Sequence, residues 1–213
     1  MDWKESIEEN ADETCAFDIE EMIINNIKAG FLSDEEILEE CAEYVAEYVK
    51  YDLKEDYPED KDKFTKNILT GVIKDYRAKF QNTGTEENFL KLKLAFENID
   101  KHGIVTQHCA GYTLSDGIDD CNEVADIRCK CGENIIGYCF YTTQDVEHLT
   151  LGVSSVLYMA FGSYTDNIDA VEIGKIIVTE LENAGFSTEW DNSAGKRIAI
   201  KDIVWDKQYN EYN

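Results

Sequence analysis

Hydrophobic residues recur at helical spacing through the first third of the chain. The apolar stripes span residues 7–27, 37–49 and 64–76. Apolar side chains three or four positions apart on an acidic background predict amphipathic helices. Gly30 is expected to end the first helix, and Ser33 with Glu36 forms a capping box that opens the second. We therefore predict that residues 1–82 form a helical subdomain or cap.

After a polar linker at residues 81–85, a fourth helix is expected over 89–99, and the pattern then changes. Strands are predicted at 104–109, 135–141, 156–161, 187–190 and 197–200, with helices between the first four. This order predicts an α+β domain over residues 85–213, with a mixed or antiparallel sheet and helices mainly on one face. The run from Val156 to Phe161 is almost continuously apolar, as expected for a strand buried on both faces.

Charge is the main anomaly of the composition. The 213 residues include 45 acidic and 20 basic ones, which gives a formal net charge of −25. This field opposes direct nucleic-acid binding, because such binding depends on lysine and arginine neutralising phosphates. A basic protein partner is attracted instead, although the same charge serves solubility alone. With no membrane-length apolar stretch and no leader pattern, the expected location is the cytoplasm.

The seven cysteines are an odd number and are scattered along the chain, which favours reduced thiols over a disulfide framework. A zinc site is the alternative interpretation. Its candidate ligands are His108, Cys109, Cys129 and Cys131, with Cys121 as a further thiol. The Cys129-Lys130-Cys131 spacing is tighter than the usual structural zinc pair. The sequence therefore favours free thiols, and we expect no metal and no cofactor.

The most suggestive polar group lies at one predicted strand-to-helix corner. It consists of Tyr138, Tyr141, Gln144, Asp145 and His148. Residues 145 and 148 are three apart, so on a helix they share a face, and a carboxylate beside a histidine can orient it as a general base. The same residue types are also common in caps and hydrogen bonds. No nucleophile elbow, phosphate loop or dinucleotide motif accompanies them.

Two motifs carry a resemblance to a known family. One is a Gly-Tyr-x-Phe-Tyr…Gln-Asp strand-to-helix turn, and the other is a closing Gly-Phe-x-x-Glu-Trp segment. Their residues here are Gly137, Tyr138, Phe140, Tyr141, Gln144 and Asp145, then Gly185, Phe186, Glu189 and Trp190. Over residues 89–205 the chain resembles a family of uncharacterised bacterial proteins. The resemblance does not include the N-terminal helices of this chain. The resemblance implies no activity, because that family has none assigned.

Two functions therefore stay open at the level of sequence. The first is a non-enzymatic cytosolic interaction module that binds a basic protein partner, as toxin-neutralising inhibitors or immunity proteins do. It is favoured by the charge and by the lack of a catalytic motif. The alternative is an enzyme or small-ligand binder that uses the corner from Tyr138 to His148.

Overall fold

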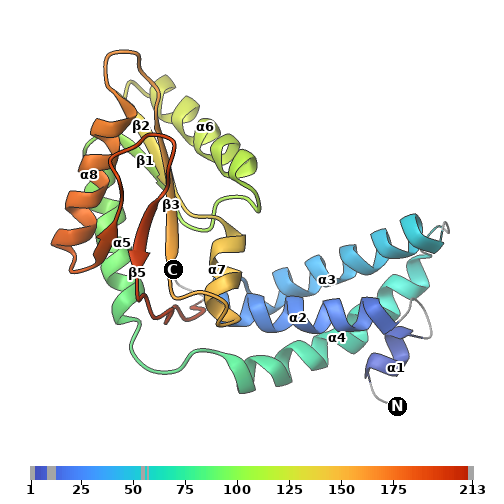
Figure 1. Ribbon diagram of the computed structural model, residues 1–213. Coiled ribbons are helices and arrows are strands. Elements are labelled where there is room, and N and C mark those ends of the chain that lie inside the picture. Colours follow the sequence, from blue (N-terminus) through green and yellow to red (C-terminus); the bar gives the residue numbers. More distant parts are fainter. Residues whose placement is uncertain (1–2, 9–12, 54–55, 57, 211–213) are drawn as a thin grey trace. The chain divides into compact units, whose positions relative to one another are not determined.

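The computed structural model describes residues 3–8, 13–53, 56 and 58–210 (Figure 1). The chain divides into two compact units. The helical unit comprises residues 1–84 together with 207–213, and the sheet unit comprises residues 85–206. No helix among the described residues is long and apolar enough to cross a membrane.

The helical unit is built from antiparallel amphipathic helices. They are α1 (Trp3–Glu8), α2 (Glu13–Ala29), α3 (Asp34–Tyr48) and α4 (Glu59–Phe80), with a short π-helix, η1 (Val49–Leu53), after α3. Ile19, Ile23 and Ile27 repeat every four residues along α2 and are fully buried, so they form the apolar stripe that the spacing predicts. The capping box of Ser33 and Glu36 is confirmed, with both reciprocal hydrogen bonds present.

The last described residues return to the helical unit. Lys207 is 6% exposed, and its Nζ lies 4.8 Å from the ring centroid of Phe31. Its backbone carbonyl accepts a 2.8 Å hydrogen bond from Nδ2 of Asn82. Gly30, which ends α2 as predicted, has a φ of +75°, and a Cβ there would lie 2.7 Å from the Lys207 carbonyl oxygen. The backbone and side chain of Lys207 are thus a packed part of this unit.

The sheet unit has the predicted order of elements. They are α5 (Glu87–Asp100), β1 (Ile104–Gln107), α6 (Leu114–Lys130), β2 (Gly137–Phe140), α7 (Thr143–Thr150), β3 (Leu157–Ser163), α8 (Ala170–Asn183), β4 (Ser187–Glu189) and β5 (Ile198–Lys201). The strands form one sheet in the order β1-β2-β3-β5-β4. Only β1 and β2 are parallel, and the other pairs are antiparallel. The predicted α+β class with a mixed sheet is confirmed.

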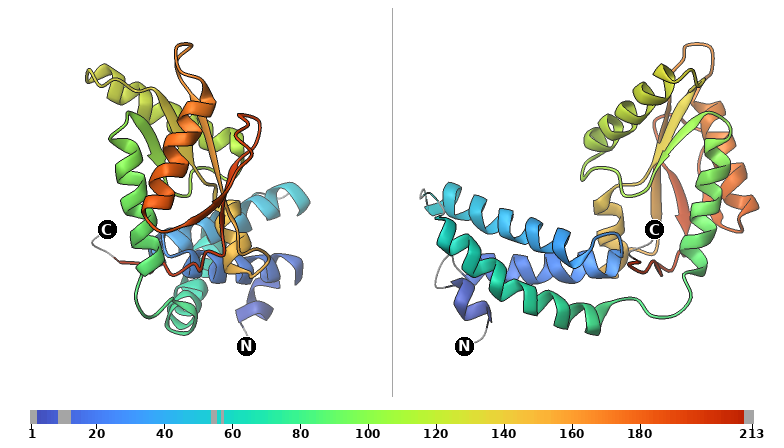
Figure 2. Two further views of the ribbon diagram at one scale, coloured as in Figure 1. Left: turned by 60° about the vertical axis from the view of Figure 1, so that its left-hand side comes forward. Right: turned by 180° about the vertical axis from the view of Figure 1, so that it is seen from behind.

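Two helices cover one face of this sheet and one covers the other. Figures 1 and 2 show α5 and α8 on one side and α6 on the opposite side. Side chains alternate along β2 accordingly: Phe140 packs against α6, whereas Gly137 faces Ile173 of α8. Gly117 lets α6 approach closely, because a Cβ there would lie 2.3 Å from Cε2 of Phe140.

The predicted burial of the third strand is wrong. The third strand was expected to be buried on both faces, but Tyr158 of β3 is 40% exposed. The reason is the coverage of the sheet: α6 packs mainly on β1 and β2. The α6 side of β3 and β5 is therefore partly open to solvent.

Candidate functional site

The two tyrosines of the predicted corner lie on opposite faces of the sheet. Tyr138 packs on the α6 side, with its ring 6.0 Å from that of Phe140. Tyr141 is completely buried on the other side, against Phe96 of α5. Its hydroxyl lies 2.8 Å from Nδ1 of His108, which stacks on Phe96. Burial raises the pKa of the Tyr141 hydroxyl well above its ordinary value.

Asp145 is buried at the start of α7 and is held by hydrogen bonds. Thr142 caps the helix and donates to Oδ2 from its backbone N–H and its hydroxyl, at 3.1 and 2.8 Å. Nη1 of Arg197 lies 3.0 and 2.8 Å from the two carboxylate oxygens. The carboxylate therefore caps a helix and joins α7 to the residue before β5.

Gln144 and His148 are the exposed members of the corner. They are four residues apart on α7, so they share its solvent face. Among the residues that the structure describes, no hydrogen bond joins His148 to Asp145. The five residues of the corner thus occupy separate environments, and a site that uses all of them stays a prediction.

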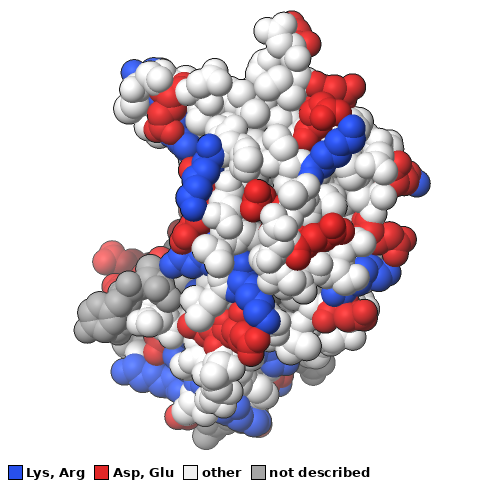
Figure 3. All heavy atoms as spheres, turned by 90° about the vertical axis from the view of Figure 1, so that its left-hand side faces the viewer, with Lys and Arg blue, Asp and Glu red and all other residues white. Residues whose placement is uncertain are grey.

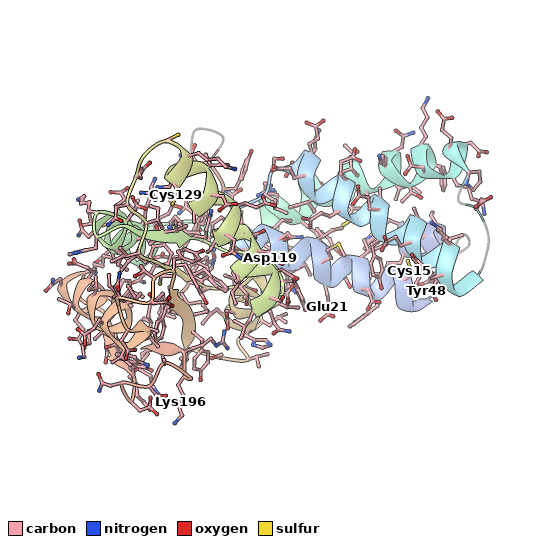
Figure 4. All side chains as sticks on the ribbon, turned by 90° about the horizontal axis from the view of Figure 1, so that it is seen from above. Cys15, Glu21, Tyr48, Asp119, Cys129 and Lys196 are labelled. Atoms are coloured by element: carbon pink, nitrogen blue, oxygen red, sulfur yellow. The ribbon has the colours of Figure 1, made fainter. Side chains whose placement is uncertain are left out.

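The candidate zinc ligands lie at different ends of the sheet unit. His108 and Cys109 follow the last residue of β1, whereas Cys129, labelled in Figure 4, lies on the last turn of α6. Beside it, Arg128 pairs with Asp100, which precedes β1. Within the described ranges, no three histidine, cysteine or acidic side chains lie close enough to hold a metal ion.

Helix α3 concentrates acidic side chains that the sequence reasoning did not single out. Its acidic residues are Asp34, Glu35, Glu36, Glu39, Glu40, Glu43 and Glu47, and it has no lysine or arginine. All of these glutamates are exposed. Arg77 pairs with Asp34, and Nζ of Lys66 lies 2.7 Å from Glu39. No ion pair is present at Glu35, Glu43 or Glu47 among the described side chains. The sequence pattern that could have indicated this acidic face is the presence of seven acidic residues within one predicted helix.

A hollow of about 310 Å³ lies on this face of α3. It is lined by Leu32, Glu35, Glu36, Glu39 and Glu40. Leu32 packs against the helical core and gives the hollow an apolar side chain beside four glutamates of α3. Such a site suits a lysine or arginine side chain, which has an apolar stem and a charged end.

The carboxylates of the hollow differ in their electrostatic environment. The backbone N–H of Ser33 lowers the pKa of Glu36. Partial desolvation, and then the nearby charges of Glu36 and Glu43, raise the pKa of Glu40, although Nδ2 of Asn26 donates a 2.9 Å hydrogen bond to it. The negative charge of Glu40 is therefore less favourable in the folded protein than in solution.

The surface over α5 and α8 has a different character. Figure 3 shows lysine and arginine side chains interleaved there with acidic ones. Nζ of Lys91 lies 2.6 Å from Glu87, and Lys175 and Glu172 are paired at the same distance. On α5 and α8, acidic and basic side chains therefore alternate in part as ion pairs, whereas α3 has no basic residue of its own.

Comparison with known proteins identifies a family but no relative of known function. No curated protein matches the chain, and no solved structure does. The model of a domain of unknown function, DUF6891, matches residues 12–209. The expected limit of the family at residues 89–205 is therefore wrong, because the match includes the N-terminal helices. The chain belongs to the DUF6891 family.

Proposed function

We propose that this protein is a non-enzymatic interaction module that binds a basic protein partner through the glutamate face of α3. The observation that carries the proposal is the hollow lined by Leu32 together with Glu35, Glu36, Glu39 and Glu40 of α3. An arginine or lysine of the partner would place its methylenes on Leu32 and its charge among the carboxylates.

Repulsion between the carboxylates of α3 in the free protein supports binding of a basic partner. The pKa of Glu40 is raised by desolvation and by like charges, so an incoming cation relieves an unfavourable interaction as well as forming new ones. The net charge of −25 also steers basic partners toward the molecule. We propose that the partner is inhibited by this contact, in the manner of toxin neutralisation.

The proposal is tested with peptides of defined charge. A fluorescent Arg- and Leu-containing peptide is titrated in low and in high salt, and a peptide with glutamine in place of arginine serves as its control. Binding that depends on arginine and weakens at least tenfold in high salt is expected, since exposed charges are screened. Affinity that is equal for the two peptides contradicts the proposal.

Matched variants locate the contact. Glu35→Gln, Glu39→Gln and Glu40→Gln together remove three charges from the hollow and leave the Glu36 cap in place. Asp119→Asn, Asp120→Asn and Glu123→Gln remove three charges from exposed positions on α6. We expect the first set to weaken peptide binding at least tenfold and the second to change it less than twofold. If both sets lost the same affinity for the peptide, net charge alone would explain binding, and the assignment to the hollow would be wrong.

A further inference from the structure

A second hollow, of about 180 Å³, lies on the α6 side of the sheet, wholly within the sheet unit. The lining residues that matter here are Leu114, Ile118, Tyr138, Ala160, Lys196 and Arg197. The first turns of α6 form one wall, β2 and β3 form the floor, and the loop before β5 forms the other wall. Lys196, labelled in Figure 4, belongs to that loop. We call this hollow the β3 groove.

Two small residues of β3 lie at the floor of the β3 groove and next to it. Ala160 and Gly162 face the α6 side of β3, since they pair with Phe140 and Tyr138 of β2. The Tyr138 ring lies directly over Gly162, where a Cβ would be 2.5 Å from its hydroxyl oxygen. Burial raises the pKa of Tyr138, so its hydroxyl keeps its proton and can donate. In the described part of the chain that hydroxyl has no hydrogen-bond partner.

Arg197 is fixed beside this groove with donors still unused. Its Nη1 is bound to Asp145, and its guanidinium lies 4.9 Å from the ring centroid of Tyr158. Nε and Nη2 make no hydrogen bond to any residue that the structure describes. Lys196 is paired at 2.8 Å with Asp191, but both side chains are exposed, so the pair is weak and easily exchanged.

We propose that the β3 groove binds a small carboxylate with an aromatic or branched apolar body. The body would lie on Leu114, Ile118 and Ala160, and the carboxylate would accept hydrogen bonds from Nε and Nη2 of Arg197, the planar fork that suits it. Lys196 adds positive charge at the rim. The volume is below the roughly 300–1,000 Å³ of sites for drug-sized ligands, so the ligand is small. This site is separate from the face of α3 and does not depend on the proposed partner.

Phenylacetate is the probe for this proposal. It is titrated to millimolar concentration into the full ¹⁵N-labelled chain, and amide shifts are followed. We expect saturable shifts at residues 194–197 and at Tyr138. Phenylacetamide has the same shape without the charge and should bind at least tenfold more weakly. Absence of saturable shifts in the groove, or equal binding of the amide, overturns the proposal.

Four variants separate the contributions of the groove. Arg197→Lys keeps a positive charge opposite Asp145 but loses the fork, so binding should weaken about tenfold. Ala160→Val fills the floor and should abolish binding. Lys201→Gln removes an exposed charge that pairs with Glu189 outside the groove, and should leave binding unchanged. Melting curves show whether each variant folds. Tyr138→Phe removes one hydroxyl donor and should independently weaken binding of phenylacetate. Undiminished binding in Ala160→Val contradicts the assignment.

Discussion

At the scale of single residues, Glu40 lies where the fold disfavours its negative charge. Its folded-state pKa is raised, chiefly by desolvation and then by Glu36 and Glu43. An acid with a raised pKa favours the folded state when it is protonated. That contribution is present below its ordinary pKa of 4.5 and is lost as the pH rises through the folded value.

Glu40→Gln should therefore stabilise the protein at pH 7, because it removes like-charge pairs worth roughly 0.2–0.5 kcal/mol each on a helix. The gain should vanish below the ordinary pKa of glutamate. Urea unfolding at neutral and acidic pH measures both. Glu36→Gln is the matched control. It should lower the free energy of unfolding at pH 7, because hydrogen bonds from Ser33 lower the pKa of Glu36 and so favour its charged form. A loss of stability in Glu40→Gln at pH 7 would contradict this interpretation.

The cysteines should differ sharply in reactivity. Burial raises the pKa of both Cys41 and Cys121 to about 12, and the thiolate is the reactive form. Cys129 and Cys131 are exposed. Iodoacetamide at mildly alkaline pH should label Cys129 and Cys131 in the folded protein, and Cys41 and Cys121 only after denaturation. Peptide mapping by mass spectrometry measures this order. Labelling of Cys121 as fast as Cys129 would show that α6 opens.

At the scale of elements, Asp145 ties the start of α7 to the strand region at Arg197. Asp145→Ala removes the cap interaction and leaves Arg197 without its carboxylate, so we expect a loss of about 2–4 kcal/mol in the free energy of unfolding. Gln144→Ala, at the exposed neighbouring position, should change it by less than about 0.5 kcal/mol. Urea denaturation compares the two. An unchanged stability in Asp145→Ala would return this carboxylate to the list of ligand-binding candidates.

Local elements were predictable from the sequence, whereas their pairing was not. The capping box at Ser33 and the helix end at Gly30, which has a φ of +75°, were both predicted correctly, because capping depends on neighbouring residues. The insertion of β5 between β3 and β4 depends on contacts between distant segments.

The same limit applies to the predicted corner. The spacing placed residues 145 and 148 correctly on one helix. The main partner of Asp145, however, is Arg197, which lies 52 residues further along the chain. No local pattern could reveal that pair. Strand alternation indicated only that Arg197 points away from Ile198.

At the scale of the whole molecule, the chain passes between its two units twice. It leaves the helical unit after Gly84 and returns at Lys207. Nε2 of Gln208 donates a 2.7 Å hydrogen bond to the Gly84 carbonyl, so the outgoing and returning segments are joined. Asp206, the last residue of the sheet unit, accepts hydrogen bonds from the backbone of Asn88 and Phe89 and thereby caps α5. Asp206 thus stabilises the sheet unit, whereas the segment that begins at Lys207 stabilises the helical unit.

Ending the chain after Asp206 should therefore weaken the helical unit and spare the sheet unit. The truncation leaves the amide of Asn82 without one of its two acceptors and exposes the packing surface of Gly30 and Phe31. Loss of buried hydrogen bonds costs about 1–3 kcal/mol. Hydrogen exchange in α2 and α4 should accelerate about tenfold or more, while exchange in β2 and β3 stays unchanged.

Two point variants test the same junction from opposite sides. Asn82→Ala removes the hydrogen bonds to Lys28 and Lys207 and should accelerate exchange in the same helices, to a smaller extent. Asp206→Ala removes the cap of α5 and should instead affect the sheet unit, by about 1 kcal/mol. Exchange measured by mass spectrometry assigns each effect to its unit. If the truncation accelerated exchange in β2 and β3 as much as in α2, the returning segment would stabilise the whole chain, and the division at Lys207 would be wrong.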